Sequence, residues 1–245
     1  MNSSTCMYDC SSLVRLGSSS SSRSDQETWR LLYDRQCQML EGRACQEFVE
    51  AVQKIQPLIY NLPNLELLSE QLYSYSGWRI FPVDGLVPSD DFFNLIGNRY
   101  FPVATFIRSG EDLDYSPLPD MWHDIFGHLP LLFNSSVYRE FLENIAREIY
   151  QASDPDYKKT LENLFWYTIE SGVCQENGEL RVYGSSQLSS FNEISYALSE
   201  QVTVVPLEEV DIGIFSINIH TVQTTIFKIP CFDYLGQIDF KLLSK

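Results

Sequence analysis

Apolar residues recur at helical spacing through the central part of the chain. Phe48, Val52 and Ile55 follow Ala44 at intervals of three or four positions, and this run predicts a helix that ends at Pro57. The same spacing predicts further amphipathic helices in four later segments. Their marker positions are Leu65, Leu68 and Leu72; residues 90–95; Val137, Phe141, Ile145 and Ile149; and Leu161, Leu164 and Thr168.

A capping signal marks the start of the ordered chain. Ser24 and Glu27 form an S-x-x-E capping box directly before the apolar residue Trp29. Upstream of this box, the serine run 18–22 and the few large apolar residues cannot bury enough surface to offset the entropy of ordering. We therefore expect a flexible, serine-rich tail over residues 1–23 and one folded domain over residues 24–245.

The pattern changes to short β-prone segments after Gly178. Strict alternation of strands and helices, which is typical of a doubly wound sheet, does not occur in the sequence. The expected fold class is mainly α, of the α+β type, with a few short strands late in the chain. The predicted strands cover residues 180–183, 202–207, 214–219 and 224–229.

Composition and charge narrow the range of partners. Hydrophobic residues make up 44% of the 245 residues, which suits one globular core. The formal charge of -16 argues against nucleic acid and anionic membrane surfaces as partners. Apolar stretches fall short of the roughly 18 residues that a membrane span needs, and the six scattered cysteines suit a reduced, cytoplasmic protein. A small and roughly neutral ligand fits these properties best.

Two of the three histidines lie close together in the segment WHDIFGHLP, residues 122–130. His123 and His128 are five positions apart, so on a regular α-helix their side chains diverge by roughly 140°. They converge if the helix ends or loosens between them, and Gly127 and Pro130 permit this. Two histidines alone are also consistent with ordinary, partly buried polar residues.

A carboxylate is the best candidate for a third metal ligand. Glu170 stands in the strongly apolar segment FWYTIESGV, where a charge is costly unless it is paired or bound to a metal. Two imidazoles and one carboxylate leave coordination positions open, as in non-haem Fe(II) oxygenases. The same ligands also suit a zinc hydrolase, and a carboxylate at a helix end can simply form a salt bridge. Spacing does not choose between iron and zinc.

Four longer motifs carry a family resemblance. They are GWRIFPVDGLV, FIRSGEDLDYSPLPDMWHDIFGHLPLL, FWYTIESGV and VYGSSQLSSFNE, within a collinear match from about residue 28 to about residue 232. In sequence and order they resemble the pterin-dependent aromatic amino acid hydroxylases, especially the compact bacterial members. The resemblance implies the aromatic amino acid hydroxylase fold, a single helical, basket-like catalytic domain with a few short strands.

The resemblance also implies ligands and cofactors. His123, His128 and Glu170 match the residues that bind Fe(II) and act in catalysis, with tetrahydrobiopterin or a related tetrahydropterin as cofactor and O2 as co-substrate. The residues that match the pterin site are Gly85, Leu86, Val87, Ser89, Phe92 and Asp124. Those that match the substrate site are Arg108, Ser116, Pro119, Trp166, Ser189 and Ile219.

Within these sites the resemblance implies distinct roles. Phe92 stacks on the pterin ring, and Arg108 holds the carboxylate of the amino acid through its planar fork. Pro119 and Trp166 enclose the ring of the substrate, while Ser189 lies beside the first histidine and orients it. The implied reaction places one atom of O2 on the ring of a free aromatic amino acid.

Phenylalanine is the expected substrate, with tryptophan and tyrosine as alternatives. Trp166 matches the phenylalanine- and tyrosine-using branches, whereas Ile219 matches the tryptophan-using branch. An apolar pocket separates rings of different size by only a few kcal/mol, so mixed specificity is consistent with the sequence. A non-catalytic binding or effector protein on the same scaffold is the alternative function.

Some positions depart from the family pattern without removing a ligand. Leu118 replaces a glutamate that is common in animal relatives, and Phe165 replaces a tyrosine near the metal. Asn94 and Leu95 replace small residues that follow the pterin-stacking position. The sequence shows neither a regulatory domain nor the long C-terminal heptad helix of animal members, so we expect a monomer.

Overall fold

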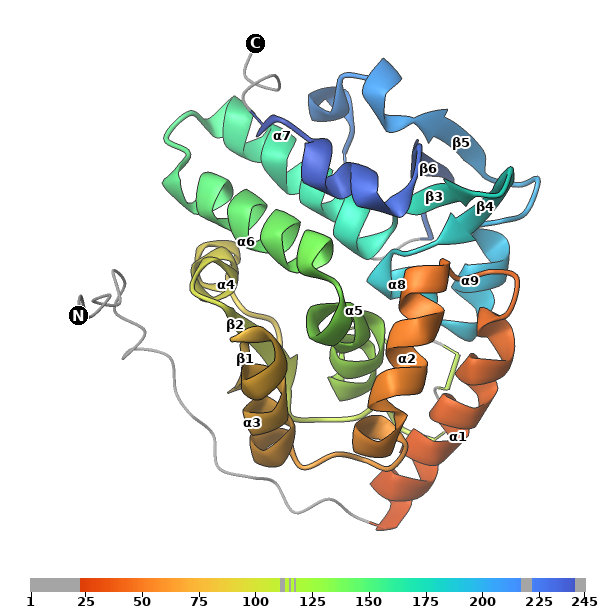
Figure 1. Cartoon of the computed structure of the whole chain (residues 1–245). Coiled ribbons are helices and arrows are strands. Elements are labelled where there is room, and N and C mark those ends of the chain that lie inside the picture. The colour runs from red at the N-terminus through yellow and green to blue at the C-terminus, as the bar shows by residue number, and fades with distance from the viewer. Residues whose placement is uncertain (1–22, 111–112, 115, 117, 217–221, 241–245) are drawn as a thin grey trace.

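The computed structural model has the predicted fold class, with many helices and a few short strands (Figure 1). It describes residues 23–110, 113–114, 116, 118–216 and 222–240. The predicted serine-rich tail over residues 1–23 lies outside the described part, apart from its last residue.

Two π-helical turns, η1 (His123–His128) and η2 (Trp166–Glu170), continue directly into or out of α-helices. Short 3₁₀ helices follow late in the chain, at η3 (Leu207–Glu209), η4 (Ile212–Ile214) and η5 (Phe232–Gln237). The α-helices are α1 (Arg23–Leu40), α2 (Gln46–Ile59), α3 (Leu65–Ser76), α4 (Ser89–Gly97), α5 (Leu129–Asn134), α6 (Ser136–Gln151), α7 (Pro155–Phe165), α8 (Ser185–Leu188) and α9 (Phe191–Tyr196).

Short polar side chains begin several of these helices. Asn64 accepts a hydrogen bond from the backbone N–H of Leu67 at 3.0 Å and caps α3. Ser135 caps α6 in the same way, and Asp154 accepts from two backbone N–H groups at the start of α7. The helix predicted to end at Pro57 instead runs to Ile59, because a proline in the last turn removes one donor while the N–H of Tyr60 still reaches Gln56.

The strands form two small sheets. In the larger sheet the order is β4-β3-β6-β5, and only the β3–β4 pair is antiparallel. Asn177 and Gly178 both have positive φ in the two-residue turn between β3 and β4, as this hairpin requires. The strands are β1 (Arg79–Val83), β2 (Tyr100–Ala104), β3 (Val173–Glu176), β4 (Glu179–Val182), β5 (Thr203–Pro206) and β6 (Thr225–Ile229).

The sequence analysis missed the early pair β1 and β2, which lie parallel with α4 between them. Strands β3 to β6 cluster late in the chain as predicted, but β1 and β2 were not predicted. Pro82 and Pro102 lie inside these strands and weakened their signal. Within the described part of the chain, each of the two strands pairs with just the other, so each has an edge on which proline is tolerated.

The strand predicted over 214–219 is also not formed in its described part. Ile214 closes the 3₁₀ helix η4, and the N–H of Phe215 donates back to the carbonyl of Ile212. The buried amide of Asn163 donates to the carbonyls of Ile212 and Phe215, at 2.9 Å each. A local turn and one side chain therefore satisfy groups that a strand would have paired with a neighbour.

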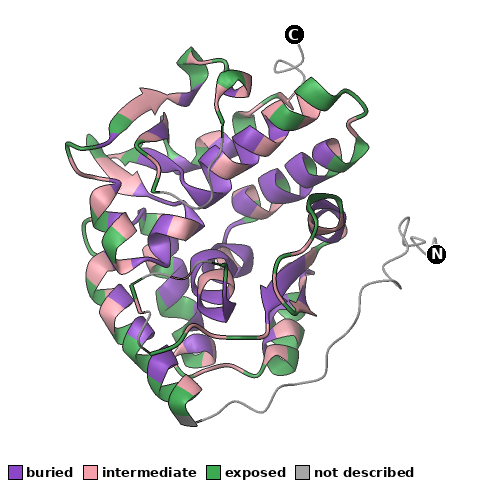
Figure 2. Ribbon diagram, turned by 180° about the vertical axis from the view of Figure 1, so that it is seen from behind, coloured by how far each residue is buried: buried purple, intermediate pink, exposed green. Residues whose placement is uncertain are grey.

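The core surrounds the segment η1–α5, which contacts α2, α3 and α6 (Figure 1). Buried residues lie on the inward faces of the helices, and α5 is buried along most of its length (Figure 2). Trp122, fully buried just before η1, stacks on Phe126 at 4.4 Å between ring centroids and meets the edge of Trp29. Aromatic packing thus supports η1 on its core side, while His123 of η1 faces a cavity.

Asn163→Ala tests the turn that replaces the predicted strand. The variant leaves two carbonyl groups without their donor, so we expect the free energy of unfolding to fall by about 2 kcal/mol. Urea denaturation measures it, with Asn192→Ala, an exposed asparagine on α9, as the matched control. Equal urea midpoints for Asn163→Ala and the unsubstituted protein would contradict this account.

Candidate active site

The π-helical winding of η1 brings the two histidines together. In a π-helix the hydrogen-bonded repeat runs from i to i+5, so residues five positions apart lie nearly above each other. The rings of His123 and His128 are 5.3 Å apart between centroids and nearly perpendicular. The helix loosens between them, as the sequence analysis required, but it does so by winding one residue wider rather than by ending.

Gly127 is required by a close backbone contact and not by an unusual backbone conformation. A Cβ atom at this position would lie 2.8 Å from the backbone oxygen of Ser185 in α8. At Gly184, directly before α8, a Cβ atom would lie 2.5 Å from the backbone nitrogen of Gly172 and 2.7 Å from the backbone oxygen of Glu170. The backbones of η1, η2 and α8 therefore meet at glycines, in contacts too close for any other residue.

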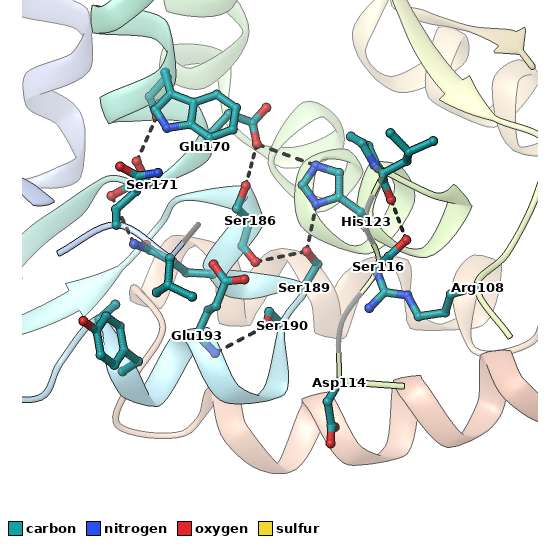
Figure 3. A pocket seen from close by; sticks show the side chains of 18 of the residues that line it. Arg108, Asp114, Ser116, His123, Glu170, Ser171, Ser186, Ser189, Ser190 and Glu193 are labelled. Carbon is teal, nitrogen blue, oxygen red and sulfur yellow. Dashed lines mark hydrogen bonds and ion pairs between the residues drawn. The ribbon is translucent and has the colours of Figure 1, made fainter. Parts of the chain in front are cut away.

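The second π-helical turn carries the carboxylate. The N–H of Ser171 donates to the carbonyl of Trp166, a bond from i+5 to i that ends η2 at Glu170. Glu170 Oε1 lies 3.4 Å from His128 Nε2, and Glu170 Oε2 lies 3.6 Å from His123 Nε2. One ligand atom from each residue lies within 4.8 Å of the other two, a grouping able to hold a metal ion. Figure 3 shows two of the three residues, His123 and Glu170.

Hydroxyl groups contact the Nδ1 atoms of both histidines. Ser189 Oγ lies 2.9 Å from His123 Nδ1, and the hydroxyl of Tyr138 lies 3.0 Å from His128 Nδ1. Ser189 Oγ also donates to the carbonyl of Ser185 at 2.8 Å, which leaves it to accept the proton of His123 Nδ1. This arrangement presents the unprotonated Nε2 of His123 to the metal position.

Burial and neighbouring groups set the protonation states. Burial alone raises the pKa of Glu170, but the charges of His128 and His123 and hydrogen bonds from His128 and Ser185 outweigh it and lower this pKa to about 2. Burial lowers the pKa of His123 to about 4 against the opposing attraction of Glu170. At neutral pH the site therefore offers an ionised carboxylate and a neutral imidazole, the forms that bind metals.

A cavity of about 260 Å³ is lined by His123 and Glu170, two of the three candidate ligands, and brings many predicted residues together. Figure 3 shows Arg108 and Ser116 on one side of His123 and Glu170, and the serines of α8 below them. The predicted residues that line it are Leu86, Arg108, Ser116, Pro119, His123, Trp166, Glu170 and Ser189. Residues that the prediction missed also line it, among them Ser186, Gln187, Glu193 and Tyr196.

Comparison with known proteins decides the family. The sequence pattern of the biopterin-dependent aromatic amino acid hydroxylases matches residues 15–237. The chain belongs to this family. It is 38% identical over 215 residues to phenylalanine-4-hydroxylase of Chromobacterium violaceum. The aligned residues cover 87% of this chain and 72% of that protein.

Two crystal structures of the C. violaceum enzyme give the same result. One, with bound iron(III) and the oxidised cofactor 7,8-dihydrobiopterin, matches with a TM-score of 0.84 at 38% identity and covers 91% of this chain and 81% of that one. The other, with iron and phenylalanine bound, matches with a TM-score of 0.82 at 36% identity and covers 91% of this chain and 82% of that one. The fold predicted from the resemblance is confirmed.

Arg108 is held by a buried partner that the sequence analysis overlooked. Asp120, fully buried, accepts from Arg108 Nε at 2.9 Å and from the NH2 group of Arg108 at 2.7 Å. Asp120 also accepts from the backbone N–H of His123 at 3.1 Å, which is the geometry of a helix cap. An aspartate three positions before a helical residue is the signal that could have revealed this link between the fork and the metal ligand.

The residues predicted for the pterin site are only partly brought to the cavity. Leu86 lines it, whereas Gly85, with φ of 134°, and Val87 flank that position. Ser89 donates instead to Glu162 in α7 at 2.9 Å. Phe92 is half-buried and meets Phe93 and Phe165 edge-on, and Asp124 accepts from the N–H of Ala104 at the end of β2.

Three positions that depart from the family pattern lie at the cavity or in α4. Leu118 lines the cavity, Leu95 is fully buried in α4, and Asn94 is buried and accepts a hydrogen bond from Asn98. Ile219 lies outside the described residues, so the clue that it offers about tryptophan stays a prediction.

Gly184→Ala tests the glycine contact between α8 and η2. The new Cβ atom must push α8 away from the backbone of Glu170, so we expect the free energy of unfolding to fall by about 1–3 kcal/mol. The matched control is Gly236→Ala, where a Cβ atom makes an ordinary 3.5 Å contact with Val137. Similar thermal unfolding of the two variants would show that the contact has no energetic weight.

The depressed pKa of His123 predicts acid sensitivity of the metal-free protein. Between its ordinary pKa of 6.5 and its folded value of about 4, the unfolded chain takes up a proton on His123 that the folded chain does not. The free energy of unfolding therefore falls as the pH falls through this window. Urea titrations at several pH values measure the free energy of unfolding. In His123→Gln this free energy should depend less steeply on pH. An unchanged pH dependence would contradict the lowered pKa of His123.

Proposed function

We propose that this chain is an iron- and tetrahydropterin-dependent monooxygenase that hydroxylates the ring of phenylalanine with O2. The observation that carries the proposal is the convergence of His123, His128 and Glu170, of which His123 and Glu170 line a cavity together with Arg108 and Trp166. Two imidazoles and one carboxylate bind one face of a metal and leave the other positions open. Family membership supports the same reaction class.

The three ligands fit a ferrous ion. Both Nδ1 atoms have hydroxyl partners, both Nε2 atoms face Glu170, and the carboxylate is buried with a pKa of about 2. A buried, ionised carboxylate between two imidazoles is a site prepared for a cation. Zinc would accept the same donors, and the iron in the relative from C. violaceum supports iron here.

The pterin would be held by the segment Gly85 to Ser89 together with Phe92 and Asp124. The half-buried ring of Phe92 supports this role, because part of its aromatic surface stays accessible. The relative crystallised with 7,8-dihydrobiopterin supports a biopterin-type cofactor. When bound, iron and the reduced pterin supply the activation of O2 and the transfer of one oxygen atom to the ring.

The chain itself positions the amino acid. Asp120 accepts from Nε and Nη2 of Arg108, and the carbonyl of Leu113 accepts from Nη1 at 3.5 Å. These contacts fix the guanidinium at the cavity wall, where its remaining N–H groups would bind the carboxylate of the substrate. Pro119 and Trp166 would enclose the substrate ring, and Ser116 would support the carboxylate. Such fixed placement is the contribution of the protein to the rate. The relative's name and its phenylalanine-bound structure rank phenylalanine before tryptophan and tyrosine.

A search of the described helices finds none with the length and apolarity of a membrane span. The monomeric state and the cytoplasmic location stay predictions from the sequence.

The proposed function is tested by the products of the loaded protein. Protein reconstituted with Fe(II) is incubated with tetrahydrobiopterin, O2 and phenylalanine, tyrosine or tryptophan separately, and the hydroxylated amino acids are separated by HPLC. We expect tyrosine from phenylalanine, and no product from His123→Ala. Absence of product with all three amino acids would favour the non-catalytic alternative on the same scaffold.

Arg108→Lys tests the substrate clamp. Lysine keeps the charge that Asp120 needs but loses the planar fork, so we expect kcat/KM for phenylalanine to fall about 10- to 100-fold. The KM for the pterin and the iron content should stay unchanged. Arg79→Lys, at an arginine stacked on Tyr73, is the matched control. If the variant bound the pterin as much more weakly as it bound phenylalanine, Arg108 would have a general structural role instead.

A further inference from the structure

Two serine hydroxyl groups hold the same oxygen atom of Glu170. Ser185 Oγ donates to Glu170 Oε2 at 2.6 Å, and Ser186 Oγ donates to the same atom at 3.0 Å. Figure 3 shows Ser186 pointing at the carboxylate from the α8 side of the cavity. Oε1 lies 3.4 Å from His128 Nε2 and Oε2 lies 3.6 Å from His123 Nε2, so it is the two hydroxyl groups that distinguish Oε2. The two carboxylate oxygens therefore have different surroundings.

The number of lone pairs makes this difference decisive. A carboxylate offers about four acceptor positions, two on each oxygen. Two hydroxyl donors on Oε2 use both of its positions, whereas the partner of Oε1 is His128, itself one of the three proposed metal ligands. Hydrogen bonds to an ionised acceptor are also among the stronger ones in proteins, so a metal must displace them before it binds Oε2.

The local sequence places both hydroxyl groups firmly. Gly184 lets α8 approach until its backbone touches that of Glu170, and Ser185 is fully buried at the first position of this helix. Ser186 is partly exposed at the cavity wall. The buried Ser185 also contacts Gly127 of η1 through its backbone, so the donors move with the histidines.

We propose that Ser185 and Ser186 are positioning residues that fix Glu170 as a one-oxygen ligand, with Oε1 on the metal and Oε2 reserved for the two hydroxyl groups. The inference rests on the metal site of the proposed function. One oxygen instead of two leaves an additional coordination position open on the iron. The clamp thereby helps to set how many small molecules the metal accepts beside its three protein ligands.

Crystal structures of the protein loaded with Fe(II) without O2 test the clamp. In the unsubstituted protein we expect iron bonded to Glu170 Oε1, with Oε2 hydrogen-bonded to both serines. In Ser185→Ala/Ser186→Ala the carboxylate rotates freely, and we expect both oxygens on the iron. Ser186→Thr, which keeps a hydroxyl group at the partly exposed position, should retain the one-oxygen mode.

Iron titration gives the second readout. Loss of partners that orient a ligand typically weakens metal binding about 10- to 100-fold, and we expect this for the double variant but not for Ser186→Thr. Ser74→Ala, on the exposed side of α3, is the serine control. Urea midpoints of the metal-free variants establish that each one folds, and Ser186→Ala, at the partly exposed position, is the fallback variant.

The outcomes separate the two proposals. Iron bonded to both oxygens in the unsubstituted protein, or the one-oxygen mode retained in the double variant, overturns the clamp and leaves the hydroxylase proposal intact. Absence of iron from the three ligands overturns both. A one-oxygen mode that becomes two-oxygen when the serines are removed supports the clamp, whichever amino acid is the substrate.

Discussion

The buried carboxylate of Glu170 is the constraint on which the rest of the site depends. A negative charge with 7% of its residue surface exposed is costly unless other groups compensate it. Two imidazoles and two serine hydroxyl groups do so within 3.6 Å. The imidazoles come from η1, the hydroxyl groups from α8 and the carboxylate from η2, so these three elements must meet at one point. The fold provides that meeting point.

Two local departures from regular helix geometry make this convergence happen. Both metal-binding segments wind as π-helices, a form that is rare and concentrates at functional sites. Gly127 and Gly184 then allow backbone contacts that no side chain would permit. The same glycines connect stability to function, because anything that separates α8 from η2 also moves the donors that orient Glu170. Asp120 makes a similar connection on the other side, between the Arg108 fork and the start of η1.

Several helices could be predicted from the sequence. The π-helical turns, the contact of Tyr138 with His128 and the strands β1 and β2 could not, for physical reasons. Regular apolar spacing predicted α3, α6 and α7, because amphipathic helices repeat every 3.6 residues. A π-helical turn has no such repeat, so the spacing of His123 and His128 predicted convergence only on the condition that the helix ends or loosens between them. Tyr138 reaches His128 from the next helix, a tertiary contact without local signal. β1 and β2 were hidden by their prolines and their shortness.

The coupling of iron binding to folding tests the central claim, that the three residues form one metal site. Fe(II) in excess without O2 should raise the free energy of unfolding, by about 2.7 kcal/mol at 100 times the dissociation constant. Urea denaturation with and without Fe(II) measures this gain in the unsubstituted protein and in Glu170→Ala. We predict a gain in the first and none in the second at the same Fe(II) concentration. Equal stabilisation of both proteins would place the metal elsewhere and contradict the account.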